Sequence, residues 1–210
     1  MFALIALTSF RARSQTTRPP NVVIILMDDM GFGDPVFNGG IGYTTPNMDR
    51  LAAEGMRFTN FYAAQPICTA SRAGILTGCY PNRLHMYGAF APWTTDALNP
   101  KEETIASMLK KRGYRTCMVG KWGLGSEPPF FPLHYGFDHY LGIPYSNDMW
   151  PVDYDGTPVT DTANRHYRYP LLPMIEGDSV LKYIRTLDDQ AEITQDYTRY
   201  ACRFIRENKD

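Results

Sequence analysis

Two adjacent carboxylates, Asp28 and Asp29, directly follow an apolar run over residues 21–27. Carboxylates held this close repel each other unless a cation or a proton lies between them. A hard divalent ion with oxygen ligands would satisfy both, so the pair is a candidate metal site. The alternative is a solvated loop in which one of the two residues caps a helix.

Cys68 and Arg72 form a second candidate group, four residues apart in the stretch Cys-Thr-Ala-Ser-Arg. A helix is expected to begin just after Cys68, and both a helix N-terminus and a nearby arginine favour an anionic side chain there. The alternative is a buried thiol beside a surface arginine. The chain's four cysteines are too few and too scattered for a disulfide scaffold.

The overall charge excludes some partners. Lysines and arginines number 21 against 22 acidic residues, a net charge of -1, so no nucleic-acid partner is expected. No apolar run approaches the roughly 20 residues of a membrane span.

The apolar pattern predicts an α/β domain with a mostly parallel sheet. Strands are expected over residues 21–27, 58–63 and 114–119, with helices over 46–54, 71–77, 102–112 and 193–205 and long loops over 125–173. Leu51 and Ala52 are expected on the buried face of the first helix. Ligands of such sheets bind beyond the carboxyl ends of the strands, where Asp28, Asp29 and Lys121 fall.

These segments, in this order, resemble the sulfatase family. The matching stretches are Asp28-Asp29-Met30-Gly31, residues 45–51, Cys68 to Arg72, Leu76-Thr77-Gly78, and Gly113-Tyr114 with Gly120-Lys121-Trp122. Residues 141–146 look especially like arylsulfatase members. The resemblance implies an alkaline-phosphatase-like layered fold and hydrolysis of sulfate esters, whether small molecules or glycans.

The resemblance also implies a set of site residues. Cys68 would be oxidised to formylglycine by formylglycine-generating machinery, and Arg72 would steady its hydrate. Asp28, Asp29 and the modified Cys68 would bind calcium, with magnesium as the alternative ion. Lys121 would contact the sulfate, and Ser146 would contact the substrate.

Formylglycine suits this chemistry because a hydrated aldehyde has two hydroxyls. One can attack sulfur, and the other can then expel sulfate and restore the aldehyde. The family's Gly-Lys-Trp is normally followed by a histidine that acts as the base for this release, but here the residue is Gly123. General-base help is worth about 10²–10⁴-fold, so slow release and an accumulating sulfated enzyme are expected.

The resemblance covers only the N-terminal portion of a sulfatase catalytic domain, over residues 19–210. The family's later substrate-binding histidine, Asp-Asn calcium ligands and second lysine have no match before Asp210. The chain alone is therefore expected to be inactive or impaired, with a weakly held metal. Residues 1–18 are expected to be a degenerate signal segment, in keeping with a secreted, periplasmic or lysosomal sulfatase.

Two alternatives remain open. The chain could be a non-catalytic relic or binding protein that keeps the fold, as Gly123 and the missing ligands would suggest. It could also be a phosphoesterase of the same superfamily, although typical phosphatases of that group use Ser or Thr in place of Cys68.

Overall fold

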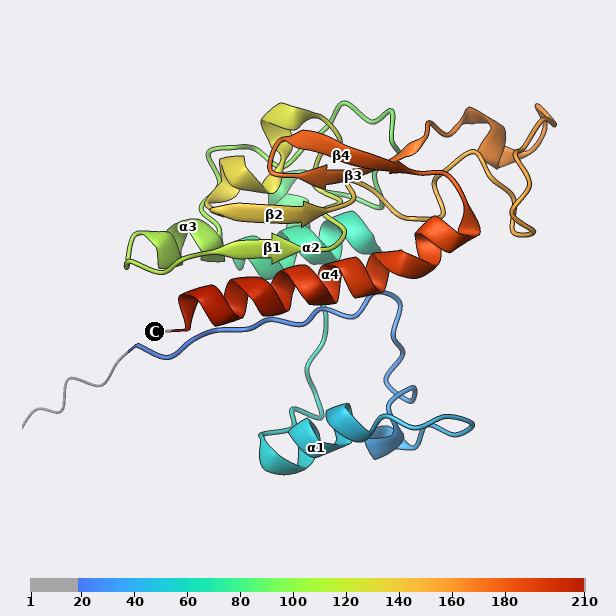
Figure 1. The fold of residues 1–210 in the computed structure, drawn as a ribbon. Helices are drawn as coiled ribbons and strands as arrows, with labels where there is room; N and C mark the ends of the chain where they lie inside the picture. Colours follow the sequence, from blue (N-terminus) through green and yellow to red (C-terminus); the bar gives the residue numbers. More distant parts are fainter. Residues whose placement is uncertain (1–18, 210) are drawn as a thin grey trace, which may run out of the picture.

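The computed structural model describes residues 19–209, whose strands form one mixed sheet in the order β1–β2–β3–β4 (Figure 1). The strands are β1 (Cys117–Val119), β2 (His139–Gly142), β3 (Leu172–Glu176) and β4 (Ser179–Ile184). β1 and β2 are parallel, whereas β2–β3 and β3–β4 are antiparallel. The predicted signal segment, residues 1–18, lies outside the described residues.

The β3–β4 hairpin turns at Gly177, whose φ of 63° suits the glycine of a two-residue hairpin loop. The apolar pattern of the sequence does not predict this hairpin. It also misses β2, which lies inside the stretch predicted as loops. That stretch otherwise contains the short 3-10 helices η3 (Pro128–Phe130), η4 (Pro132–Tyr135) and η5 (Arg165–Arg168).

Side-chain caps mark the start of two of the four α-helices in the described residues. The α-helices are α1 (Pro46–Glu54), α2 (Cys68–Thr77), α3 (Ile105–Lys110) and α4 (Leu187–Asn208), with short 3-10 turns η1 (Val36–Asn38) and η2 (Pro81–Leu84). Thr104 and Thr186 close capping boxes at α3 and α4. The predicted helices are confirmed, although α4 begins earlier than expected and α2 begins at Cys68 itself. In the described residues, no helix combines the length and apolar character needed to cross a membrane.

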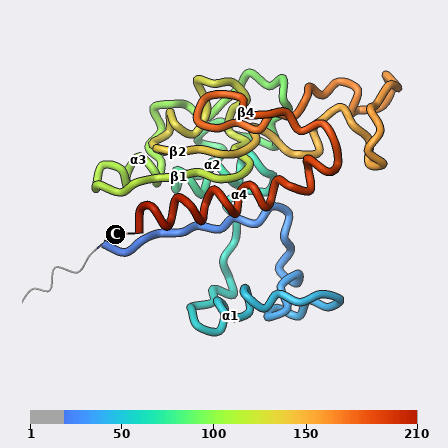
Figure 2. The backbone as a smooth tube through the Cα atoms, in the orientation of Figure 1, coloured from blue at the N-terminus to red at the C-terminus, as the bar shows by residue number. Residues whose placement is uncertain are grey.

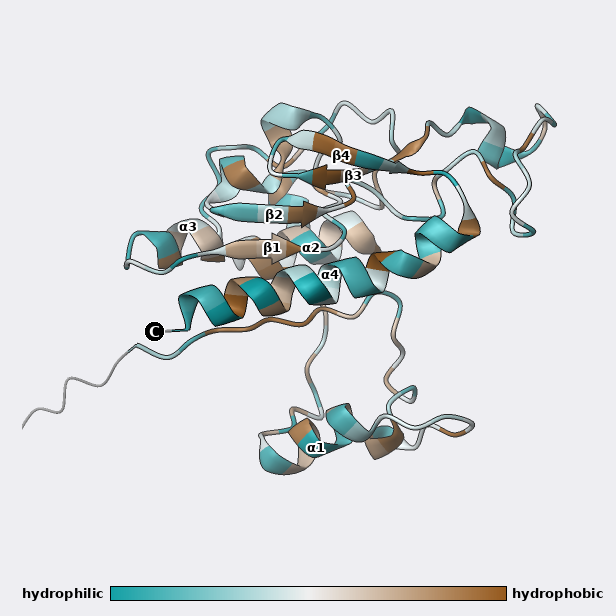
Figure 3. Cartoon of the chain, in the orientation of Figure 1, coloured by the Kyte–Doolittle hydropathy of each residue, from teal (hydrophilic) through white to brown (hydrophobic). Residues whose placement is uncertain are grey.

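The core lies in two clusters on the sheet. One surrounds Trp122, which is fully buried against Tyr135 and Phe137. The other joins β3 and β4 to the apolar stripe of α4 at Ile193, and this stripe is visible in the hydropathy colouring (Figure 3). Both clusters hold β1 and β2 in place, and so fix the segment after β1.

The segment around α1 projects away from this body (Figure 2). None of the residues of α1 is buried, and Leu51 is 62% exposed. The prediction that Leu51 and Ala52 face a core is therefore wrong. Helical spacing identifies an apolar face, but that face is buried only if another element of the fold packs against it.

Two predicted strands are also wrong. Residues 21–27 and 58–63 are not paired with any strand among residues 19–209. Val22 to Met27 are 42–71% exposed, and a hydrogen bond from Tyr114 Oη to the Pro20 carbonyl (2.9 Å) holds the start of the first segment. An apolar run states a preference for burial, but a strand also needs a partner with free backbone groups.

Candidate functional site

The candidate site lies between the N-terminus of α2 and the segment that follows β1. Cys68 is the first residue of α2, and Lys121 comes two residues after β1. The Lys121 ammonium donates to Cys68 Sγ at 3.3 Å and forms an ion pair with Asp28. Three residues far apart in the sequence therefore meet at one ammonium group.

Arg72 joins the same group from one helical turn further along α2. Its guanidinium lies 3.4 Å from Asp28 Oδ2 and donates to the Lys121 carbonyl at 2.5 Å. The side chains of Arg72 and Lys121 are each only 10% exposed. Two nearly buried cations thus flank a thiol and one carboxylate, and this excess of positive charge suits a bound anion.

Both cations lower the pKa of the Asp28 carboxyl. Partial burial raises the pKa of its carboxyl, but the hydrogen bond and charge of Lys121, with help from Arg72, outweigh burial and hold the pKa below its ordinary value of 3.8. Asp28 is therefore a carboxylate at neutral pH.

Backbone contacts fix the position of α2 against the sheet. Thr69 Oγ1 donates to the Gly123 carbonyl at 2.8 Å and accepts from the backbone N–H of Phe90 at 3.0 Å. The N–H of Gly123 donates in turn to the Pro144 carbonyl at 2.9 Å. Thr69, only 1% exposed, was not singled out from the sequence, although it lies inside the Cys68–Arg72 motif.

Gly123 has a conformation that suits glycine. Its φ is +71°, and a Cβ built there would lie 3.2 Å from Arg72 Cδ. The residue that departs from the expected histidine is thus packed against the stem of Arg72.

Two residues that border the site have a positive φ, and one of them is β-branched. Ile67, just before Cys68, has a φ of 74°, and Asp29, just after Asp28, has a φ of 55°. A β-branched residue at positive φ is a genuine outlier, and such strain tends to collect at functional sites.

Asp29 and Ser146 are not joined to this cluster. No hydrogen bond or ion pair within residues 19–209 links either side chain to Cys68, Arg72 or Lys121. Asp29 is exposed, and Ser146 is half-buried two residues beyond Pro144. The same range contains no group of three or more His, Cys, Asp or Glu residues placed to hold a metal ion, so the predicted calcium ligands are not assembled there.

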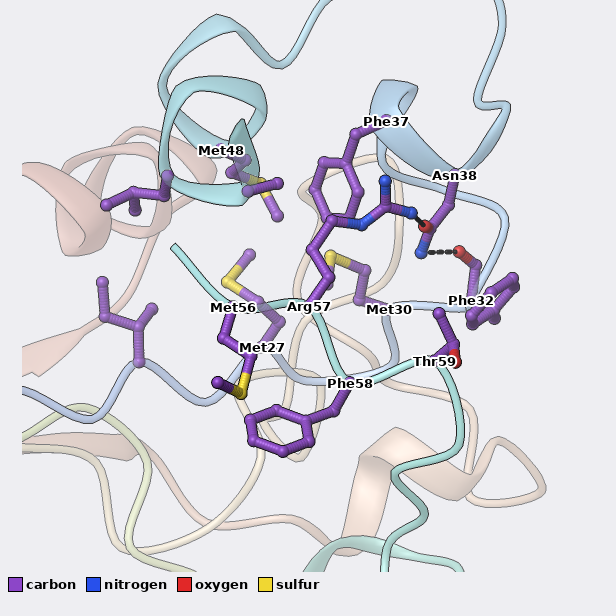
Figure 4. A pocket seen from close by; sticks show the side chains of 13 residues that line it. Met27, Met30, Phe32, Phe37, Asn38, Met48, Met56, Arg57, Phe58 and Thr59 are labelled. Carbon is purple, nitrogen blue, oxygen red and sulfur yellow. Dashed lines mark hydrogen bonds between the residues drawn. The ribbon is translucent and has the colours of Figure 1, made fainter. Parts of the chain in front are cut away.

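A separate pocket of about 400 Å³ lies between the segment after residue 24 and the α1 region (Figure 4). Its lining is mostly apolar and includes Met27, Met30, Met48 and Met56. A hydrogen bond from Arg57 to Asn38 (2.8 Å) closes one side. The pocket includes none of the predicted site residues, so it is not part of the charged cluster.

A sulfatase family model matches residues 20–202. Human arylsulfatase A is 48% identical over 148 residues, covering 69% of this chain and 29% of the relative. Mouse N-acetylgalactosamine-6-sulfatase is 47% identical, with 90% and 36% covered, and mouse arylsulfatase G is 43% identical, with 96% and 40% covered. The chain thus spans well under half the length of these curated relatives.

Solved structures of sulfatases are also similar to this chain. The PsFucS1 sulfatase from Pseudoalteromonas sp. superposes with a TM-score of 0.77 at 32% identity, covering 90% of this chain and 41% of that one. Ps i-CgsB in complex with k-i-k-neocarrahexaose superposes with a TM-score of 0.67 at 26% identity, covering 86% and 40%.

Proposed function

The chain belongs to the sulfatase family and has its alkaline-phosphatase-like fold, and from this premise we propose that it is a sulfuric ester hydrolase with Cys68 at the reacting centre. The observation that carries the proposal is the Lys121 ammonium, which contacts both Cys68 Sγ and the Asp28 carboxylate. A sulfate ester placed at Cys68 would meet this cation directly.

Position 68 suits a formylglycine. The residue is half-buried at the first position of a helix, and the family's converting machinery would oxidise it to the aldehyde. When hydrated, that group would supply one hydroxyl whose oxygen attacks sulfur and displaces the alcohol of the ester, and a second whose deprotonation expels sulfate and restores the aldehyde.

In this proposal, Lys121 and Arg72 stabilise the negative charge of the sulfate group. Sulfuryl transfer spreads negative charge over the sulfate oxygens, and nearly buried cations stabilise that charge more strongly than exposed ones. Arg72 also holds the backbone of Lys121 through the Lys121 carbonyl. Arg72 therefore orients the lysine as well as adding charge.

Calcium binding by Asp28, Asp29 and the modified Cys68, with magnesium as the alternative, stays a prediction from family membership. Asp28 is the best-placed oxygen donor because it is ionised and borders Cys68 through Lys121. Asp29 does not join it, so the three donors do not fit a metal in their present arrangement. No chemical step here depends on the ion.

We propose a sulfated glycan as substrate, with Ser146 as a contact residue. Support comes from Ps i-CgsB, a related structure that holds k-i-k-neocarrahexaose. Membership of the sulfatase family also favours a secreted, periplasmic or lysosomal location.

Two measurements test the proposal. Mass spectrometry of the peptide that contains Cys68, after expression with formylglycine-generating machinery, should show the aldehyde. Hydrolysis of 4-nitrophenyl sulfate should exceed that of 4-nitrophenyl phosphate and depend on Cys68, with Cys79→Ser as the matched control. A preference for phosphate would point instead to the phosphoesterase reading.

A non-catalytic role is the second candidate, and two observations favour it. Gly123 provides no base, and the predicted metal ligands are not assembled among residues 19–209. An unmodified Cys68 thiol, together with sulfate binding but no hydrolysis, would support this reading.

A further inference from the structure

An exposed aromatic pair joins the loop after Phe90 to the loop over residues 147–170. Trp93 and Tyr169 are stacked, with ring centroids 5.5 Å apart and planes 17° from parallel. Trp93 is nevertheless 59% exposed, whereas Trp122 and Trp150 are 0% and 4% exposed. Because Tyr169 covers one face of the indole, the opposite face is open to solvent. An exposed indole with a second ring stacked behind it is a candidate surface for the apolar face of a ligand.

His166 holds this pair in place. It is 2% exposed, and its ring packs edge-on against Tyr169 and Tyr154 with centroids 5.6 and 5.5 Å away. Its Nδ1 lies 3.2 Å from the Trp150 carbonyl, which only accepts hydrogen bonds, so Nδ1 carries the proton. Nε2 is buried without a hydrogen-bond partner among residues 19–209, so the ring is held by the Trp150 carbonyl and by its packing against the two tyrosines.

The first of the two loops that build the pair begins beside Cys68, and the second follows Pro144, whose carbonyl accepts from the N–H of Gly123 at 2.9 Å. The first passes Phe90, whose N–H is bonded to Thr69 beside Cys68. Trp93 comes three residues later, within about 11 Å of Phe90 along the chain. The second loop passes Ser146 and is tied to η5 by Arg165, 3.4 Å from Asp148.

We propose that Trp93, backed by Tyr169, forms a platform for a sugar ring of a glycan whose sulfated residue lies at Cys68. This inference rests on the proposed function and narrows its substrate class. The apolar face of a sugar would pack on the open indole face, while its hydroxyls bond to neighbouring polar groups. Residues 147–170 carry four aspartates against two arginines, so the platform favours an uncharged ring over a second sulfated one.

Binding of a sulfated galactan hexasaccharide and of its desulfated counterpart tests the platform. Both should protect Trp93 fluorescence from acrylamide quenching, because it is the exposed tryptophan. By calorimetry, Trp93→Ala should raise Kd for both about tenfold, whereas Trp93→Phe should raise it much less. Tyr80→Ala, a 70% exposed aromatic at the far end of α2 from Cys68, is the matched control and should leave Kd unchanged.

The outcomes separate this inference from the proposed function. Equal Kd values for the wild type and Trp93→Ala, or no binding of the desulfated hexasaccharide, would overturn the platform. Trp93-dependent binding without hydrolysis of 4-nitrophenyl sulfate would leave the platform standing and count against the sulfatase activity alone.

Discussion

Gly123 packs against the aliphatic stem of Arg72: a Cβ at residue 123 would lie 3.2 Å from Arg72 Cδ. Because Arg72 also contacts Asp28 and the Lys121 carbonyl, any side chain at 123 would disturb the charged cluster. The departure from the family's usual histidine is therefore coupled to how Arg72 is placed.

Gly123→Ala should lower the free energy of unfolding by about 1–2 kcal/mol, the usual cost of a Cβ in the left-handed region, plus the cost of moving Arg72. Gly78→Ala is a matched control, because Gly78 has a φ of +66° with no heavy atom within 4 Å of the added carbon. Urea denaturation of both variants isolates the Arg72 contact. Equal losses of unfolding free energy in the two variants would show that the Arg72 side chain moves aside without a measurable cost.

The missing base should show in the kinetics. A rapid release of 4-nitrophenol equivalent to the enzyme, followed by a slow phase, is expected because sulfate release lacks help worth about 10²–10⁴-fold. Gly123→His should not restore fast turnover, since its side chain must first displace Arg72. Linear product release by the wild type, with no early phase, would contradict this prediction.

Lys121→Met removes the ammonium but keeps an unbranched side chain only one heavy atom shorter. Hydrolysis of 4-nitrophenyl sulfate should fall by about 10²-fold or more, as is typical for the loss of a transition-state donor. Inorganic sulfate should raise the Tm of the wild type but not the Tm of Lys121→Met. Lys182→Met, which breaks the 2.9 Å pair with Asp196, makes the same change away from the site. A similar response of both variants would remove Lys121 from the proposed chemistry.

Sequence patterns predicted the candidate site better than the sheet. The spacing of Cys68 and Arg72 is one helical turn, so a local rule brings them together, and Lys121 was expected at the end of a strand. The apolar run over 21–27 predicts a strand, but pairing is a non-local property that the run itself does not encode.

The sequence does not predict the β3–β4 hairpin or the positions of the Asp29 and Ser146 side chains, and the reasons are related. β3 contains Pro173, which weakens a strand signal. Asp29 and Ser146 were placed by family resemblance alone, and a motif fixes residue order without fixing where a side chain points. Loop backbone decides that, as the φ of 55° at Asp29 illustrates.

Asp28 should make stability depend on pH in acid. Because its folded-state pKa is held below 3.8, its contribution is fully present above about pH 5 and is lost as pH falls through the folded pKa. The difference in unfolding free energy between wild type and Asp28→Asn should therefore be constant near neutrality and shrink below about pH 4. Urea titrations from neutral pH downward measure it. A difference that grows toward low pH would mean that the Asp28 carboxyl is not stabilised by Lys121 and Arg72.

Ile67→Gly should stabilise the fold even though it removes a large side chain. Ile67 is 57% exposed and has a φ of 74°, so little burial is lost while about 1–3 kcal/mol of backbone strain is released. Glycine costs about 0.5–1 kcal/mol through the unfolded chain, which leaves a net gain of about 1 kcal/mol. Ile67→Val keeps the β-branch and should bring no gain. If urea denaturation shows Ile67→Gly to be less stable than the wild type, the positive φ of Ile67 does not destabilise the fold.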